Sequence, residues 1–120
     1  MKAKKKNFLD SELSLNEKSK EKAKFHVLPI PLEKTVSYGK GTANGPKAIL
    51  DASNELERFT GKGEPCVNGI FTHPFLNCNL PIENLMLNIE KKTKEISKKN
   101  KIPVILGGEH SITFGAVNGV

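Results

Sequence analysis

One segment near the end of the 120-residue chain constrains the fold more than any other. Residues 102–108, IPVILGG, form a continuous apolar run that is rich in branched side chains and closes on two glycines. An apolar run without polar alternation is typical of a strand covered on both faces, as strands of parallel sheets are. Because parallel strands are joined by crossover connections that usually contain a helix, this segment predicts an α/β fold.

The remaining segments alternate between strand and helix patterns in the order that such a fold requires. We expect strands over 25–31 (FHVLPIP) and 66–72 (CVNGIFT), and helices over 45–61, 82–99 and 111–120. Together with 102–108 this gives strand, helix, strand, helix, strand, helix, which is the α/β pattern. A single domain of this length holds about three such strands, so the sheet is small and open.

The apolar positions of the expected helices indicate which faces are buried. The helix over 82–99 is the clearest, and one face carries Ile82, Leu85, Met86, Ile89, Thr93 and Ile96 at helical spacing. We expect Met86 to fill core space rather than to ligate a metal. The helix over 45–61 begins with Gly45-Pro46, and its expected buried face is formed by Ile49, Ala52, Ser53 and Leu56.

One proline and one long loop mark irregular positions. Pro29 lies within the first strand pattern and has no N–H to donate, so we expect an irregular strand end there. Thirteen residues, 32–44, separate this strand from the first helix. Strand-to-helix loops are usually ~2–6 residues long, so this length indicates a binding or active-site role. Residues 39–45, GKGTANG, fit neither GxxxxGK[ST] nor GxGxxG, and we interpret their glycines as positions for tight turns rather than for nucleotide binding.

The charged residues are concentrated in two places. Residues 1–24 hold eight lysines and four acidic residues, and residues 91–101 hold six lysines and one acidic residue. There is one arginine, no tryptophan, and no aromatic residue between the lysines on which bases could stack. We therefore interpret the net charge of +6 as solvated lysine faces and expect no nucleic-acid partner. We assign 1–24 as a polar N-terminal leader and 25–120 as an α/β domain.

The sequence also limits the cellular setting. No stretch has the ~20 apolar residues of a membrane-spanning helix, and no apolar signal region follows the first lysines. Cys66 and Cys78 are too few for a disulfide framework and match no zinc pattern, so we expect two free thiols. We therefore expect a cytoplasmic protein with no membrane partner.

The three histidines differ in where their segments place them. We expect His26 to be packed within the first strand or at its edge, and His73 to be solvated in a loop. His110 follows the strand over 102–108, at the carboxyl end where parallel sheets bind their ligands. At that position a neutral imidazole can ligate a transition metal, act as a base, or be structural.

The neighbours of His110 are suited to a sharp turn into a helix. Gly107 and Gly108 leave room for backbone or a ligand to approach closely. Ser111 and Glu109 are candidate capping residues for the last helix. No HxxxH, HExxH or Asp/His cluster accompanies His110, so we assign no catalytic residue and no cofactor-binding residue. We interpret three acidic residues of the first helix as surface charge: Asp51, Glu55 and Glu57.

Two segments resemble a known family. Residues 103–117, PVILGGEHSITFGAV, are similar to the GG[DE]HS segment of the ureohydrolases, which include arginase and agmatinase. Residues 28–59, LPIPLEKTVSYGKGTANGPKAILDASNELERF, resemble the N-terminal part of agmatinases, with its YGKGTxxGPxAI core. The two segments stand in the family's order, and the resemblance covers about residues 25–120. The GGEHS form and the YGKGT loop both favour agmatinase over arginase.

This resemblance implies a three-layer α/β/α fold with a central parallel sheet, of which the chain is the N-terminal portion. It implies a pair of Mn²⁺ ions at the strand ends, which activate a bridging water to attack a guanidinium carbon and release urea. The histidine of GG[DE]HS ligates one of the two ions, and that role carries over to His110 alone. The implied reaction converts agmatine to putrescine and urea, a step of polyamine metabolism, in a homo-oligomer. Agmatine is the first substrate that the resemblance implies, and arginine, guanidinobutyrate and other guanidino compounds stay open as alternatives.

Two hypotheses follow from what the chain does not contain. The family's DAHxD and SxDxDxxDP motifs supply its other metal ligands and come after GG[DE]HS, and neither occurs here. The first hypothesis is that the chain is the N-terminal part of an agmatinase-like, Mn-dependent hydrolase, inactive by itself. The alternative is a non-catalytic remnant or interaction module of the same fold, whose open sheet would expose apolar surface.

Overall fold

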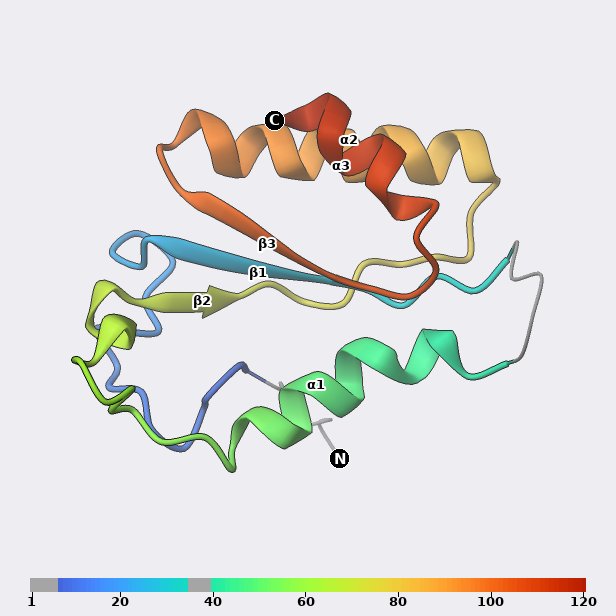
Figure 1. The fold of residues 1–120 in the computed structure, drawn as a ribbon. Coiled ribbons are helices and arrows are strands. Elements are labelled where there is room, and N and C mark those ends of the chain that lie inside the picture. Colours follow the sequence, from blue (N-terminus) through green and yellow to red (C-terminus); the bar gives the residue numbers. More distant parts are fainter. Residues whose placement is uncertain (1–6, 35–39) are drawn as a thin grey trace, which may run out of the picture.

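A three-stranded parallel sheet forms the centre of the molecule. The computed structural model describes residues 7–34 and 40–120. Strands β1 (Phe25–Ile30), β2 (Ile70–Thr72) and β3 (Ile102–Gly107) lie in the order β2-β1-β3, so the first strand in the sequence is the central one (Figure 1). Phe25 is paired with Ile70 of β2 and with Ile102 of β3. The predicted α/β fold with a parallel sheet is confirmed.

Helices lie on both faces of this sheet. Helices α2 (Ile82–Lys98) and α3 (Ile112–Gly119) lie on one face, and α1 (Gly45–Ser53) lies on the other (Figure 1). Two short 3₁₀ turns, η1 (Thr42–Asn44) and η2 (Pro65–Asn68), precede α1 and β2. The three layers predicted from the resemblance are therefore present, with a sheet of three strands between them.

The face under α2 and α3 holds the main hydrophobic core. Its buried members come from β1, the segment after it, and both helices: Leu28, Ile30, Leu32, Leu85, Ile89, Ile112 and Ala116. Four of the six positions predicted for α2 are fully buried, and Met86 packs against the core as expected. Small residues let the two helices approach closely, because a Cβ on Gly115 would lie 2.8 Å from the carbonyl oxygen of Met86.

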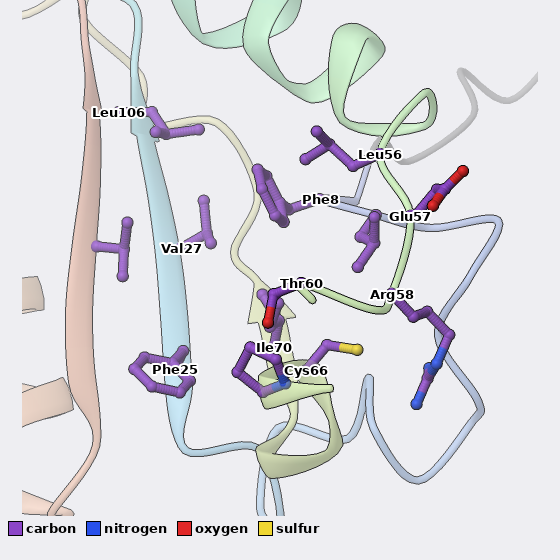
Figure 2. Close-up of a pocket in the computed structure, with 13 residues that line it drawn as sticks. Phe8, Phe25, Val27, Leu56, Glu57, Arg58, Thr60, Cys66, Ile70 and Leu106 are labelled. Carbon is purple, nitrogen blue, oxygen red and sulfur yellow. The ribbon is translucent and has the colours of Figure 1, made fainter. Parts of the chain in front are cut away.

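The opposite face is less completely covered. A cavity of about 320 Å³ lies between the sheet, the segment after α1 and the N-terminal segment (Figure 2). Its lining includes Val27 and Val104 from the sheet, Leu56 from the segment after α1, and Phe8. Val104 is 37% exposed. The expectation that 102–108 is covered on both faces is thus wrong, because Val104 of the edge strand β3 borders this cavity and remains partly exposed.

Helix α1 is shorter than predicted, and of the four residues predicted for its buried face only Ser53 is buried. It ends at Ser53, and its buried residues are Pro46, Leu50 and Ser53, whereas Leu56 lies beyond the helix and is half exposed. The hydroxyl of Ser53 donates to the carbonyl of Leu50 and accepts from the backbone N–H of Leu9. This pair of bonds attaches the N-terminal segment at the end of α1, so contacts from a distant segment select the buried face.

The strand β1 continues past Pro29 to Ile30. The carbonyl of Pro29 accepts from the backbone N–H of Leu76, a residue that follows β2. Because the nitrogen and the carbonyl of one strand residue point to the same side, the Pro29 nitrogen also faces the side of β2, and β2 has already ended at Thr72. No ladder bond is lost there, and the predicted irregular strand end is absent.

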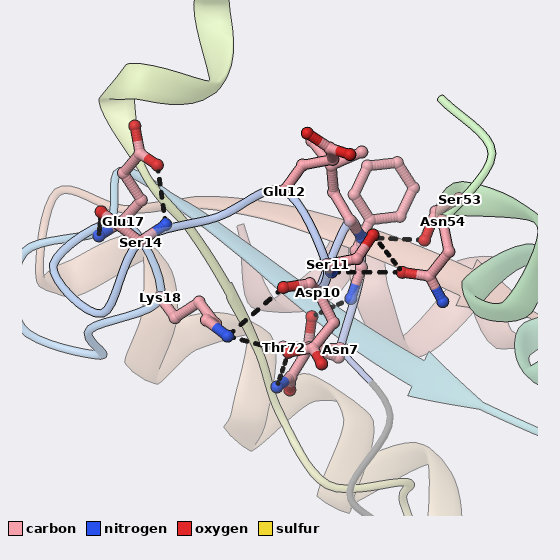
Figure 3. A network of polar contacts seen from close by, with 12 residues as sticks. Asn7, Asp10, Ser11, Glu12, Ser14, Glu17, Lys18, Ser53, Asn54 and Thr72 are labelled. Carbon is pink, nitrogen blue, oxygen red and sulfur yellow. Dashed lines mark hydrogen bonds and ion pairs between the residues drawn. The ribbon is translucent and has the colours of Figure 1, made fainter. Parts of the chain in front are cut away.

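Residues 7–24 form successive turns that pack against the domain. Leu9 and Leu13 are buried in a small cluster with Cys66, and the backbone N–H of Phe8 donates to the hydroxyl of Thr72. Figure 3 shows the polar contacts of this segment, in which Lys18 pairs with Asp10 at 3.1 Å. Among the described residues, no helix has both the length and the apolarity needed to cross a membrane.

Candidate metal centre

His110 lies where the sequence predicts it, in the turn between β3 and α3 at the carboxyl end of the sheet (Figure 1). Its side chain is exposed, and its carbonyl accepts from the backbone N–H of Thr113 in the first turn of α3. The position is typical of ligand sites in parallel α/β folds, because loops that leave the strand ends meet at this edge.

Backbone segments meet very closely beside this turn. A Cβ on Gly108 would lie 2.6 Å from the backbone nitrogen and oxygen of Leu32, and one on Gly45 would lie 2.9 Å from the carbonyl oxygen of Gly107. The turn therefore contacts both the exit of β1 and the beginning of α1. Of the two alternatives for the glycines, the structure places backbone rather than a ligand against Gly108.

The carboxylate of Glu109 connects these segments. Glu109 is 7% exposed, and its Oε1 accepts from the backbone N–H of Lys34 while its Oε2 accepts from the hydroxyl of Ser111 at 2.9 Å. Its own backbone N–H donates to the carbonyl of Leu32 at 2.8 Å. Sequence reasoning considered Glu109 only as a helix cap. Ser111 occupies the N-cap position but makes no capping bond, since its hydroxyl points to Glu109 instead.

A second carboxylate accepts hydrogen bonds from two backbone N–H groups that precede α1. The Oε1 of Glu33 accepts from the backbone N–H groups of Gly41 and Thr42 at 2.6 and 2.7 Å. These are the donors that a phosphate-binding loop would direct at its ligand. An internal carboxylate therefore takes the place of an external anion, in agreement with the interpretation of 39–45 as turn glycines. Residues 35–39 of the predicted long loop lie outside the described residues.

The described residues supply one metal-ligand candidate and no complete metal centre. Within 7–34 and 40–120, no group of three or more His, Cys, Asp or Glu side chains is placed to hold a metal ion. An exposed neutral imidazole at the carboxyl end of the sheet can ligate a transition metal. The remaining ligands of a dinuclear site are not present among these residues, so we derive no chemical step through bound manganese.

The other two histidines form a buried pair at the opposite end of the sheet. His26 Nδ1 and His73 Nε2 lie 2.9 Å apart, and His26 Nε2 lies 3.0 Å from the carbonyl oxygen of Lys20. His26 is packed in β1 as expected, but the prediction that His73 is solvated is wrong, because His73 is 7% exposed. The chain after β2 continues alongside β1, where the backbone N–H of His73 donates to the carbonyl of Val27. Burial lowers the pKa of His26 below 6.5.

The surface and thiol assignments from the sequence are also settled by the structure. The two cysteines are free thiols, and burial raises the pKa of Cys78. The three acidic side chains assigned to the surface, Asp51, Glu55 and Glu57, are exposed.

Comparison with known proteins decides the family. The model of the arginase family matches residues 23–120, which is most of the chain and includes both segments discussed above. The chain belongs to the arginase family. It is 35% identical over 127 residues to an N(1)-aminopropylagmatine ureohydrolase of Synechocystis sp., and 32% identical over 115 residues to one of Thermococcus kodakarensis.

Solved structures agree with this assignment. The agmatine ureohydrolase of Thermoplasma volcanium superposes with a TM-score of 0.78 at 30% sequence identity, covering 93% of this chain and 41% of that one. The chain likewise spans 39% of the length of the Synechocystis relative. This arginase-family chain therefore corresponds to the N-terminal part of its relatives.

Proposed function

We propose that this chain is the N-terminal portion of an agmatinase-like hydrolase that cleaves a guanidino compound with the help of Mn²⁺. The observation that carries the proposal is the exposed His110, which stands on a braced turn at the carboxyl end of a parallel sheet in an arginase-family chain. In the proposed reaction, water adds across a C–N bond of agmatine: the guanidinium carbon leaves as urea, and the nitrogen leaves as the amine of putrescine.

The contribution of this chain to the reaction is limited to holding and positioning. His110 would be one ligand of the manganese pair, and bound manganese would make hydroxide available near neutral pH. The remaining ligands would come from segments that its relatives have beyond the matched portion. By itself, the 120-residue chain is therefore proposed to be inactive.

The substrate is the least constrained part of the proposal. The relatives are named for N(1)-aminopropylagmatine and the superposed structure for agmatine, and both compounds carry a guanidino group. We propose agmatine as the substrate, and its aminopropyl derivative is the alternative substrate to test against it. The proposed setting is cytoplasmic, in a homo-oligomer, without a nucleic-acid or membrane partner.

A chimera tests the proposal. Residues 25–120 replace the matched portion of the Synechocystis relative, whose own later segments then provide the missing ligands. With Mn²⁺ present, the chimera is expected to release urea from agmatine or N(1)-aminopropylagmatine, while the 120-residue chain releases none. His110→Ala in the chimera should reduce kcat/KM by at least 100-fold, and Glu55→Ala, at an exposed position, serves as the matched control.

The results separate the possible outcomes. A folded chimera without urea release would refute the proposed hydrolase function, and an active chimera in which His110→Ala keeps full activity would refute the assignment of His110 as a ligand. The alternative function, a non-catalytic interaction module, is favoured by the partly open face around Val104 and Leu56. That alternative predicts an inactive chimera and association of the 120-residue chain in sedimentation experiments.

A further inference from the structure

We propose that Glu109 is a positioning residue, which fixes the turn that carries His110 by joining it to the exit of β1. The inference rests on the proposed function, since positioning matters only if His110 is a ligand. The hydrogen-bond network is independent of that function and can be tested by itself.

The Glu109 carboxylate is buried and hydrogen-bonded on both of its oxygens. A carboxylate that is 7% exposed must replace its lost hydration with hydrogen bonds, and the two oxygens of Glu109 accept from two different segments. One bond reaches Lys34, 75 residues away in sequence, and the other reaches Ser111 at the start of α3. The side chain thus joins the segment after β1 to the start of α3, on either side of the turn that contains His110.

The backbone around this carboxylate also fits closely. The Glu109 N–H donates to the Leu32 carbonyl, and the Cα of Gly108 faces the same residue with no space for a Cβ. The turn is therefore held from both sides: Gly108 and the backbone of Glu109 contact Leu32, and the side chain of Glu109 binds Lys34. His110 is the next residue, and its own side chain is exposed.

The segment that Glu109 holds makes further contacts of its own. Lys34 donates its backbone N–H to Glu109 and its ammonium group to the carbonyl of Leu80, which precedes α2. Glu33, its neighbour, accepts from Gly41 and Thr42 before α1. Residues 33 and 34 therefore connect the beginnings of α1 and α2 with the turn of His110. Loss of the Glu109 carboxylate would break the connection between that turn and residues 33 and 34.

The consequence for catalysis follows from ligand geometry. Catalytic and metal-binding side chains must be held within about 0.5 Å of the productive position, and groups behind the ligands usually hold them there. Glu109 does this through the backbone rather than through the imidazole ring, because its bonds fix the residues on both sides of His110. Its loss is therefore expected to lower kcat and leave KM for the guanidino substrate nearly unchanged.

Hydrogen exchange of the 120-residue chain tests the network. Glu109→Ala is compared with Glu109→Gln, whose amide can accept from Lys34 and donate to Ser111, and with Glu55→Ala as an exposed control. In Glu109→Ala the backbone amides of Lys34 and Glu109 should exchange at least tenfold faster, and the ring NMR signals of His110 should shift. The amides of α2 should keep their rates, which shows that the fold is intact. Glu109→Gln and Glu55→Ala should stay within about threefold of the original rates.

Unchanged exchange in Glu109→Ala, or an equal effect in Glu109→Gln, would overturn the proposal. If Glu109→Ala unfolds the chain, the milder Ser111→Ala, which removes the hydrogen bond from Ser111 alone, should raise the same exchange rates by a smaller factor, and no increase would overturn the proposal.

The chimera gives the catalytic readout, in which Glu109→Ala should lower kcat at least tenfold at constant KM. Altered exchange with unchanged kcat would refute the positioning role alone. A chimera that is inactive before any substitution refutes the proposed function and with it the positioning role, which has no ligand left to position; the exchange result then stands as a description of the network only.

Discussion

The two faces of the sheet are covered to different degrees, although β1 sends apolar side chains to both. Under α2 and α3 the core is closed, with Leu85 and Ile89 fully buried. On the face of α1 a cavity of about 320 Å³ remains, and Leu56 and Val104 border it with substantial exposure. The closed face is formed by helices that approach through small residues, whereas the other face depends on the short α1 and the turns of residues 7–24.

From this difference we expect the closed side of the sheet to contribute most of the free energy of unfolding of the chain. Burial in a closed core contributes both transfer free energy and packing, so truncation there leaves a cavity. A side chain that already borders a cavity has fewer neighbours to lose. The candidate metal centre lies at the end of the sheet, where its turn runs from β3 into α3 and so belongs to the closed side.

The largest expected effect compares two leucines, one from each face. Leu85→Ala should lower the free energy of unfolding by about 2–5 kcal/mol, because a fully buried side chain leaves a cavity in the closed core. Leu56→Ala, at a half-exposed position beside the existing cavity, should cost less than about 1 kcal/mol. Denaturant unfolding of both variants measures the difference. Equal losses would show that the two faces contribute alike.

The next prediction concerns substitutions that enlarge a side chain instead of truncating it. Ala116→Leu inserts three carbons between α3 and the core, and we expect a loss of about 1–3 kcal/mol from overpacking. Val104→Leu adds one carbon at the edge of the cavity and should be close to neutral. Thermal melting monitored by circular dichroism would detect both. If Val104→Leu destabilises the chain as much as Ala116→Leu does, the face of α1 is closed in solution.

A smaller effect concerns pH and the histidine pair at the far end of the closed face. Because burial lowers the pKa of His26, the unfolded chain binds a proton more readily than the folded chain below pH 6.5. Stability is therefore fully present above pH 6.5 and declines as the pH falls below it.

The positive charges around the histidine pair also disfavour its protonation, in agreement with this loss of stability at low pH. Among the described residues, the charged side chains near it are Lys20, Lys92, Lys99 and Lys101, and the acidic Glu95 lines the same recess. Unfolding in denaturant at pH 7.5 and 5.5 measures the slope. His26→Asn, which removes the titrating ring but keeps a polar atom near Nδ1, should give a shallower dependence, and an unchanged slope would exclude His26 as its source.

The smallest effect belongs to the face of α1, where the N-terminal segment is attached by an ion pair. Hydrogen bonds from Arg58 and from the backbone of Ser14 lower the pKa of Glu17 to about 2. The pair contributes stability above the ordinary pKa of 4.5, and this contribution declines as the pH falls from 4.5 towards 2. Glu17→Gln should remove this acid-dependent part and destabilise the chain less than Ala116→Leu does. Salt should weaken the original pair and leave the variant unaffected, and equal salt dependence would contradict this account.

Prediction from sequence succeeded where local periodicity alone determines structure. The buried face of α2 follows from a 3.6-residue repeat that needs no information about its partner, so Leu85 and Ile89 were placed correctly. The position of His110 followed from the end of an apolar strand. For α1 the start and the burial of Ser53 were predicted correctly, but the end of the helix and the burial of Leu50 were not, because they depend on contacts with distant segments such as that of Ser53 with Leu9.

At the candidate site and the histidine pair, local sequence patterns likewise failed to predict contacts between distant segments. Nothing in the local pattern of GGEHS distinguishes a helix cap from a carboxylate that reaches another segment, so Glu109 was assigned the local role. His73 was assigned to solvent because the sequence around it contains proline and lacks apolar periodicity. Its burial comes from alignment beside β1, which only the parallel register of the sheet provides.

The sequence by itself determined the alternation of strands and helices, the parallel sheet, and the location of His110 at a strand end. These depend on hydrophobic spacing and chain punctuation, which act over a few residues. Long-range packing, by contrast, establishes which face is closed, which histidines form a pair, and which segment Glu109 binds. Those outcomes depend on contacts between residues far apart in sequence, as with Lys34 and Glu109, where the folded backbone rather than the local pattern brings donor and acceptor together.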